Sequence, residues 1–207
     1  MRNTLVILFA MSMVMIACGP SIYMTPDAYE RSAKHQKIAI LPPKVNLPPQ
    51  RKVSPEALEA QSKAESSSFQ NEIYQAFLRR KSKGQIFVDI QDVEETNVLL
   101  ARNFPEGVYT NAEVCKVLGV DAAVTSQFTL SKPMSEGAAI ATMVLVGFAA
   151  TTNEVKVNMS IKDCSDNTMF WNYDYQYSGS VTTTVSALVD GLMRNASRKI
   201  PYNSQSN

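Results

Sequence analysis

The sequence predicts an α/β fold: a single domain in which a mixed sheet of about five strands has helices packed on it. Two observations predict it. Short apolar or alternating runs, typical of strands, recur between longer runs whose apolar residues repeat at three and four positions, as in helices. The chain of 207 residues, less an amino-terminal leader, also has the length of one domain with its own core.

The leader is the most specific feature of the sequence. Arg2 supplies a short basic start, an apolar run extends from Leu5 to Ala17, and Cys18 follows directly. This is the layout of a secretory signal, and the cysteine at the cleavage point resembles the signal of a bacterial lipoprotein. An uncleaved anchor would need about twenty apolar residues, and an ordinary cleavage site would want a small residue where Met15 stands. Met15 also departs from the leucine that is usual in lipoprotein signals.

The resemblance implies that residues 1–17 are a signal peptide and that Cys18 is the lipidation site and the mature amino terminus. It would carry fatty acyl chains such as palmitate, and two or three chains hold a protein durably because each buried CH₂ contributes about 0.8 kcal/mol. An aspartate after the cysteine often retains such proteins at the inner membrane, and Gly19 stands there instead. We therefore expect a lipid-anchored envelope protein on the periplasmic face of the outer membrane.

Charge and cysteine content narrow the classes of partner. The chain has 20 basic and 19 acidic residues, and removal of the leader, which holds one arginine and no acid, leaves 19 of each. A neutral chain without a basic cluster lacks the electrostatic footprint of a nucleic-acid-binding protein. Besides Cys18, the chain has Cys115 and Cys164, which are far apart in sequence. Two unpaired thiols are the expectation, although disulfides can form in the envelope.

The first half of the chain predicts a tether, a strand and a helix. After Cys18, residues 18–36 open with Gly-Pro-Ser-Ile-Tyr and continue as a polar stretch to Gln36, and they are expected to tether the domain to the lipid. The apolar run 37–41 predicts a strand buried on both faces, inside the sheet. Residues 42–49 contain four prolines and are expected to form a stiff loop outside the sheet. A helix is expected over 54–84, with a serine N-cap, a proline in the first turn and a glycine at its end.

Two strands and two short helices follow. Alternation over 86–90 predicts a strand. Helices are predicted over 92–101 and 110–119, because an aspartate or a threonine at the start of each has a glutamate three residues later. Apolar residues then recur on one side over 120–130, which predicts a third strand.

An apolar insert, residues 134–152, interrupts the domain. Its residues 138–150 carry no charge, yet they are too few for a spanning helix or for two strands of a membrane barrel, which need about 9–11 residues each. The segment is either a buried part of the core or an exposed contact. The second alternative is considered because exposed apolar patches of this size usually mark interaction sites. The candidate contacts with a partner or the membrane are Met143, Val144, Leu145, Val146 and Phe148.

The last part of the chain predicts a hairpin and a helix. Residues 154–162 and 169–177 both alternate, and the polar turn 163–167 joins them. The aromatic residues of the second run either form a ligand platform or, as we expect, pack beneath the helix that follows. That helix spans 181–200, and residues 203–207 are expected to form a loose tail.

Four short motifs lie within the expected domain, residues 37–202. They are Lys37 to Pro43 after a tether, Leu118 to Ala122 before a strand, Ile161 to Asp163 with Trp171 in a hairpin, and Lys199 to Pro201 at the end. Together they resemble a group of bacterial envelope lipoproteins whose domain is like the amino-terminal domain of TolB. The group includes lipoproteins of unknown function, the curli-secretion lipoprotein CsgG, and activators of peptidoglycan synthases. CsgG places two amphipathic strand pairs in the membrane, whereas this chain has one apolar insert without alternation.

No catalytic constellation is apparent in the sequence. Its one histidine, His35, falls in the expected tether, and no glycine-rich phosphate loop occurs, so neither an enzyme nor a cofactor is expected. We expect a non-enzymatic adaptor or assembly factor that binds another envelope protein, or its own copies, through the insert 134–152 and nearby sheet edges. The alternative is a subunit of an oligomeric outer-membrane secretion complex of the CsgG type.

Overall fold

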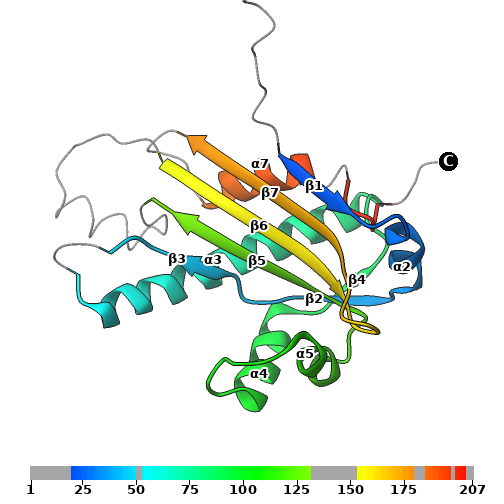
Figure 1. The fold of residues 1–207 in the computed structure, drawn as a ribbon, viewed down its shortest axis with the longest axis horizontal. Helices are drawn as coiled ribbons and strands as arrows, with labels where there is room; N and C mark the ends of the chain where they lie inside the picture. Colours follow the sequence, from blue (N-terminus) through cyan, green and yellow to red (C-terminus); the bar gives the residue numbers. More distant parts are fainter. Residues whose placement is uncertain (1–19, 50–52, 132–152, 180–184, 197–198, 204–207) are drawn as a thin grey trace, which may run out of the picture.

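The centre of the fold is a mixed sheet of seven strands. The computed structural model describes residues 20–49, 53–131, 153–179, 185–196 and 199–203. In spatial order the strands are β1 (Ser21–Met24), β7 (Met169–Gly179), β6 (Asn153–Asp163), β5 (Ala122–Leu130), β2 (Lys37–Ile40) and β4 (Asp89–Ile90), and β3 (Lys44–Asn46) pairs with β5 (Figure 1). The helices are α2 (Ala28–Lys34), α3 (Pro55–Ser82), α4 (Val93–Asn103), α5 (Asn111–Leu118) and α7 (Val185–Ala196). The predicted class, a single α/β domain, is confirmed, with more strands than expected.

The parallel half of the sheet consists of β2, β4 and β5. β2 lies between the other two and is parallel to both, and its last three residues are buried. This confirms the interior strand predicted from an unbroken apolar run, because a strand covered on both faces does not alternate. The predicted strand 86–90 is shorter than expected, since only Asp89–Ile90 belongs to β4 and Ile86 instead forms an isolated bridge with Asn203.

β3 corrects the expectation that the proline-rich segment 42–49 stays outside the sheet. Its three residues pair in parallel with β5. The prolines flank this run, so every residue of β3 keeps its N–H. Hydroxyls on α3 satisfy carbonyls of the segment: Ser62 Oγ donates to the carbonyl of Val45 at 2.5 Å, and Ser66 Oγ to that of Pro43 at 2.6 Å. The polar first half of α3 is therefore used to hold this strand.

One face of the sheet is covered by α3 and α7, which lie behind the strands in Figure 1. α3 begins at the predicted cap, because the Ser54 side chain accepts a hydrogen bond from the N–H of Ala57. The two helices and the sheet enclose the larger apolar core, in which the rings of Phe69 and Phe128 stack with their centroids 3.9 Å apart. α7 occupies part of the predicted helix 181–200. Its buried apolar residues repeat at three and four positions, from Val185 to Ala196.

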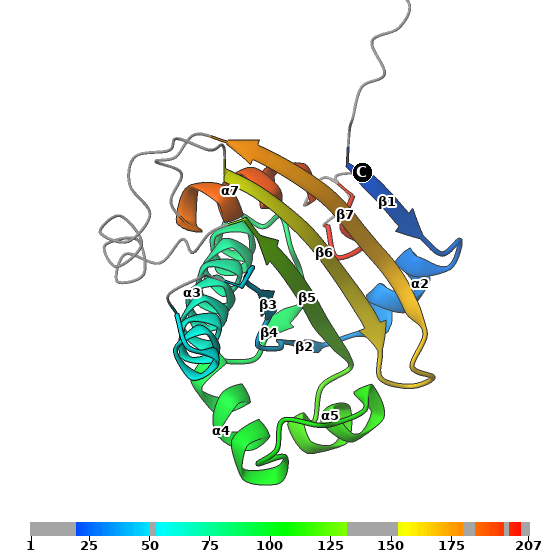
Figure 2. The same ribbon diagram turned by 60° about the vertical axis from the view of Figure 1, so that its left-hand side comes forward.

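The opposite face is covered in part, by α4 and α5 (Figure 2). Both helices begin at their predicted caps, since Asp92 accepts two backbone N–H groups and Thr110 forms a capping box with Glu113. α5 ends at Gly119, the last residue of the predicted range, which has a positive φ of 62°. The smaller core beneath these helices consists of Ala39, Leu41, Leu100, Val114, Leu118, Val120 and Ala123. None of the described helices is both long and apolar enough to span a membrane.

The predicted hairpin is formed by β6 and β7, which pair in antiparallel register along most of their length. Trp171 and Tyr173 are fully buried, and Tyr175 and Tyr177 pack half-buried against the same core as α7. The expectation that this aromatic run lies beneath a helix is therefore confirmed. The indole N–H of Trp171 donates to the carbonyl of Lys199 at 2.9 Å, so its polar atom is also satisfied.

The segment before β2 belongs to the domain, so the expected tether 18–36 is wrong from Ser21 onward. β1 pairs antiparallel with β7, with Ser21 opposite Asp174. α2 packs on the domain, and Ser32 Oγ donates to the carbonyl of Pro201 at 2.8 Å, across 169 residues of sequence. A four-residue strand and a seven-residue helix give no strong local signal, and the contacts that hold them lie at the other end of the chain.

Candidate functional site

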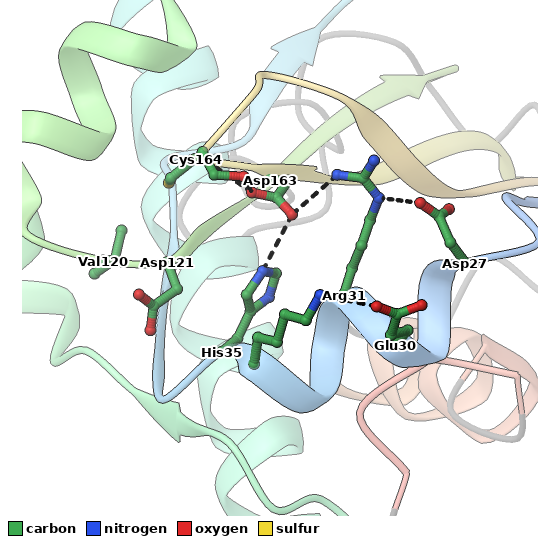
Figure 3. Close-up of a pocket in the computed structure, with 10 residues that line it drawn as sticks. Asp27, Glu30, Arg31, His35, Val120, Asp121, Asp163 and Cys164 are labelled. Atoms are coloured by element: carbon green, nitrogen blue, oxygen red, sulfur yellow. Dashed lines mark hydrogen bonds and ion pairs between the residues drawn. The ribbon is translucent and has the colours of Figure 1, made fainter.

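A pocket of about 540 Å³ lies between α2, the residues before β5, and the turn that joins β6 to β7 (Figure 3). Acidic and basic side chains line it together, among them Asp27, Arg31, His35 and Asp163. Titratable groups with shifted pKa values around a pocket often mark functional sites. We therefore treat this pocket as the candidate site.

Arg31 on α2 is the central cation of the site. Its Nε donates to Asp27 Oδ2 at 2.6 Å, and its Nη1 donates to Asp166 Oδ2 at 2.7 Å and to Asp163 Oδ2 at 3.3 Å. Hydrogen bonds to Asp166 and Asp27 raise the pKa of Arg31. The backbone N–H of Thr168, together with Arg31, lowers the pKa of Asp166 to about 2. The guanidinium therefore fastens α2 to the β6–β7 turn.

His35 follows α2 and is 8% exposed, which corrects its expected place in a tether. Its Nδ1 lies 2.7 Å from Tyr202 Oη, and its Nε2 lies 3.3 Å from Asp163 Oδ2. Burial raises the pKa of Tyr202 well above its usual value, with the negative charges of Asp163 and Asp121 contributing, so the phenol stays protonated at neutral pH. His35 thus connects the turn at Tyr202 to the hairpin.

Asp163 is the common acceptor of hydrogen bonds from Arg31, His35 and Ser165. Burial alone would raise its pKa, but hydrogen bonds from the side chain and backbone of Ser165, at 2.6 and 2.7 Å, lower it together with His35 and Arg31. The net effect is a pKa below the usual value, so the carboxylate is charged at neutral pH. Both of its oxygens are engaged, one by Ser165 and one by Arg31 and His35.

A disulfide joins Cys115 on α5 to Cys164 in the turn, so the expectation of two unpaired thiols is wrong. The two residues are 49 positions apart, but β5 and β6 run out and back and return the turn to the side of α5, with the Cα atoms 5.6 Å apart. Asn111 adds a second link, since its Nδ2 donates to Asn167 Oδ1 at 3.0 Å. The turn is therefore fixed to α5 on one side and to α2 on the other.

These contacts favour a structural role for Arg31, His35, Asp163, Asp166 and Tyr202, which we call the α2 cluster. The ring nitrogens of His35 and the phenol of Tyr202 are bound to each other or to Asp163 and are buried, whereas a general base must reach its substrate. Within the described ranges, no three His, Cys, Asp or Glu side chains are grouped to hold a metal ion. The arrangement acts as a clamp on the amino-terminal segment.

The residues predicted as sites lie elsewhere in the sequence. Cys18 and the whole insert 134–152, with its candidate contacts Met143, Val144, Leu145, Val146 and Phe148, fall outside the described residues and stay predictions. The sequence reasoning missed the α2 cluster. Asp163 and Ser165 stand in the predicted turn, and an aspartate two residues before a serine is a readable sign of a side-chain-capped turn. No local signal connects that turn with α2, about 130 residues earlier.

No protein-family model matches the chain, and no curated protein matches its sequence. Among solved structures, the chain is similar to the PelC dodecamer from Paraburkholderia phytofirmans, with a TM-score of 0.44 and 12% identity over 90% of this chain and 99% of that one. It is also similar to the lipoprotein GNA1162 from Neisseria meningitidis, with a TM-score of 0.46 and 11% identity over 80% of this chain and 97% of that one. A third similar structure is the LpoB C-terminal domain from Salmonella enterica, with a TM-score of 0.37 and 8% identity over 72% of this chain and 94% of that one.

Proposed function

We propose that this protein is an envelope lipoprotein, anchored by acyl chains on Cys18, that acts as a non-enzymatic adaptor or assembly factor. The observation that supports it most is the disulfide between Cys115 and Cys164. Disulfides persist in oxidising compartments and are rare in the cytosol, so the pairing fits a chain exported by the leader 1–17. Of the three cysteines, Cys18 is then the one left for lipidation, directly after the apolar run.

The adaptor role rests on how the charged groups of the domain are used. The α2 cluster is occupied by its own hydrogen bonds, which hold the amino-terminal segment to the hairpin. The insert 134–152 is the candidate contact, and in the sequence it joins two neighbouring strands, β5 and β6. Its partner is another envelope protein or a second copy of the chain, at the periplasmic face of the outer membrane.

Removal of the lipidation site tests the anchor. The variant Cys18→Ala, exported with an ordinary cleavable signal in place of residues 1–17 because Met15 does not suit ordinary cleavage, should leave the protein in the soluble periplasmic fraction, whereas the wild type sediments with membranes. The double variant Cys115→Ala and Cys164→Ala is the matched control, because it removes cysteines but keeps the anchor. If the Cys18→Ala protein still sediments with membranes at wild-type level, the lipid anchor is wrong.

Crosslinking from the insert tests the adaptor role. A photo-crosslinking residue at Val144 should form an adduct with one envelope protein or with a second copy, and Val146→Asp should abolish the adduct. The far-ultraviolet circular dichroism and thermal unfolding of purified Val146→Asp protein serve as the control. If that variant is unfolded, the segment belongs to the core, and the binding surface lies elsewhere.

A further inference from the structure

The chain enters the domain almost directly after the lipidation site. β1 begins at Ser21 and is already part of the sheet. Only Gly19 and Pro20 separate Cys18 from Ser21. A polypeptide spans at most about 3.6 Å per residue, so the Cα atoms of Cys18 and Ser21 lie within about 11 Å of each other. A tether over 18–36 would have reached at most about 65 Å.

The segment that follows Cys18 is held in place by several independent contacts. All four residues of β1 pair with β7, and the N–H of Thr25 donates to the carbonyl of Phe170 at 3.0 Å. Detachment of α2 would take Arg31 and His35 away from Asp163, which is only 4% exposed. A buried carboxylate that loses its cation is strongly disfavoured. The domain therefore does not lengthen its own tether by releasing β1 and α2.

The lipid end of this short connection is fixed by the bilayer. The hydrocarbon core is about 30 Å thick and the whole bilayer about 40–45 Å, so each headgroup layer is about 5–8 Å deep. Acyl chains on Cys18 would hold that residue at the inner boundary of the layer. Ser21, within about 11 Å of it, cannot then lie more than a few ångströms beyond the headgroups.

The edge of the sheet at Ser21 suits such a position. β1 is the last strand on its side of the sheet among the described residues, and in Figure 1 it lies on the side of the sheet away from α4 and α5. Tyr23 of β1 is 52% exposed, and tyrosine is typical of the level at which a membrane meets water. Gln176 of β7 is exposed, just beyond the point where Ser21 lies opposite Asp174.

We propose that this edge, formed by β1 and by β7 up to Gln176, rests against the phospholipid headgroups of the membrane that holds the acyl chains. The proposal rests on the lipid anchor of the proposed function. It adds that the domain has a fixed membrane-proximal edge, with β1 nearest the lipid. β2 and α4 are then turned away, since four strand spacings of about 4.8 Å place β2 about 19 Å from β1 across the sheet.

Fluorescence quenching by lipid tests the proposal on the full acylated protein. A single new cysteine is introduced as Gln176→Cys, or as Arg102→Cys on the exposed surface of α4, and is labelled with an environment-sensitive dye. The native cysteines do not react, because two form the disulfide and Cys18 is acylated. Each protein is placed in vesicles of phosphatidylethanolamine and phosphatidylglycerol that contain a lipid with a nitroxide in its headgroup. Quenching at Gln176→Cys should be several-fold stronger than at Arg102→Cys.

Two further arms separate the possible failures. A flexible insertion of 20 Gly and Ser residues between Gly19 and Pro20 gives a mean span of about 25 Å and should lower the quenching at Gln176→Cys to the level of Arg102→Cys. Equal quenching at the two positions in the protein without the insertion would overturn the proposal. Mass spectrometry of the same sample reports acylation, and its absence would count against the proposed function instead. If Gln176→Cys does not fold, Ser21→Cys replaces it.

Discussion

Loss of the disulfide should cost the domain about 4 kcal/mol of its free energy of unfolding. Cys115 and Cys164 close a loop across 49 residues of sequence, and the loop-entropy relation converts that length into about 4 kcal/mol at 25 °C. The double variant Cys115→Ala and Cys164→Ala should therefore unfold in urea at a midpoint about 2 M lower, for a slope of roughly 2 kcal/mol per M. The single tryptophan, Trp171, is fully buried and reports the transition by its fluorescence.

Both proteins should carry Cys18→Ala, so that neither the lipid nor a free thiol affects the comparison. The Cys18→Ala protein unfolded in the presence of a strong reductant provides a second measurement of the same loss. It should match the double variant, because alanine at Cys115 and Cys164 removes little else. If the double variant and the reduced protein both unfold within about 0.5 M of the oxidised protein, the disulfide does not constrain the unfolded chain as argued.

Two further predictions concern a helix end and the carboxylates of the α2 cluster. Gly119→Ala should lower the free energy of unfolding by about 1 kcal/mol, because Gly119 has a φ of 62° that alanine disfavours. Gly191→Ala should raise it by roughly 0.5–1 kcal/mol, because Gly191 lies inside α7, where alanine is the better helix former. Equal effects of the two variants in urea unfolding would refute the backbone argument. The pKa of Asp166 is lowered from 3.8 to about 2, so its stabilising bonds are intact above pH 4 and are lost as the pH falls toward 2. Thermal unfolding between pH 6 and pH 2 should show a smaller acid-induced fall for Asp166→Asn than for wild type, and parallel curves would contradict this.

Local sequence signals predicted the described helices α3, α4, α5 and α7 and most of the strands, since their causes are local, whereas α2 was not predicted. The capping box at Thr110 and the N-cap at Asp92 act within three residues, so they can be recognised without knowledge of the fold. The alternation of 154–162 survives in the structure because one face of β6 packs on the core and the other does not. Element type and approximate bounds follow from such patterns, whereas strand order does not.

The features that the sequence did not predict depend on contacts between distant residues. β1 has only four residues, and its place in the sheet is set by pairing with β7. Arg31 and His35 look like residues of a polar linker until the hairpin brings Asp163 beside them. The disulfide was missed for the same reason, because the proximity of Cys115 and Cys164 depends on the out-and-back path of β5 and β6.

Because residues from Ser21 onward belong to the domain and not to a tether, the range of partners that the proposed adaptor can reach is smaller. With acyl chains on Cys18, a domain on a flexible 19-residue tether would sample distances of about 24 Å on average from the membrane. A domain that begins at Ser21 stays on the surface, and at about 40 Å across it reaches no farther than its own thickness. Its partners must then lie within that layer, as periplasmic parts of membrane proteins or as further copies on the same leaflet. Confinement to one leaflet also raises the effective concentration of copies, which favours self-association over capture of a distant soluble protein.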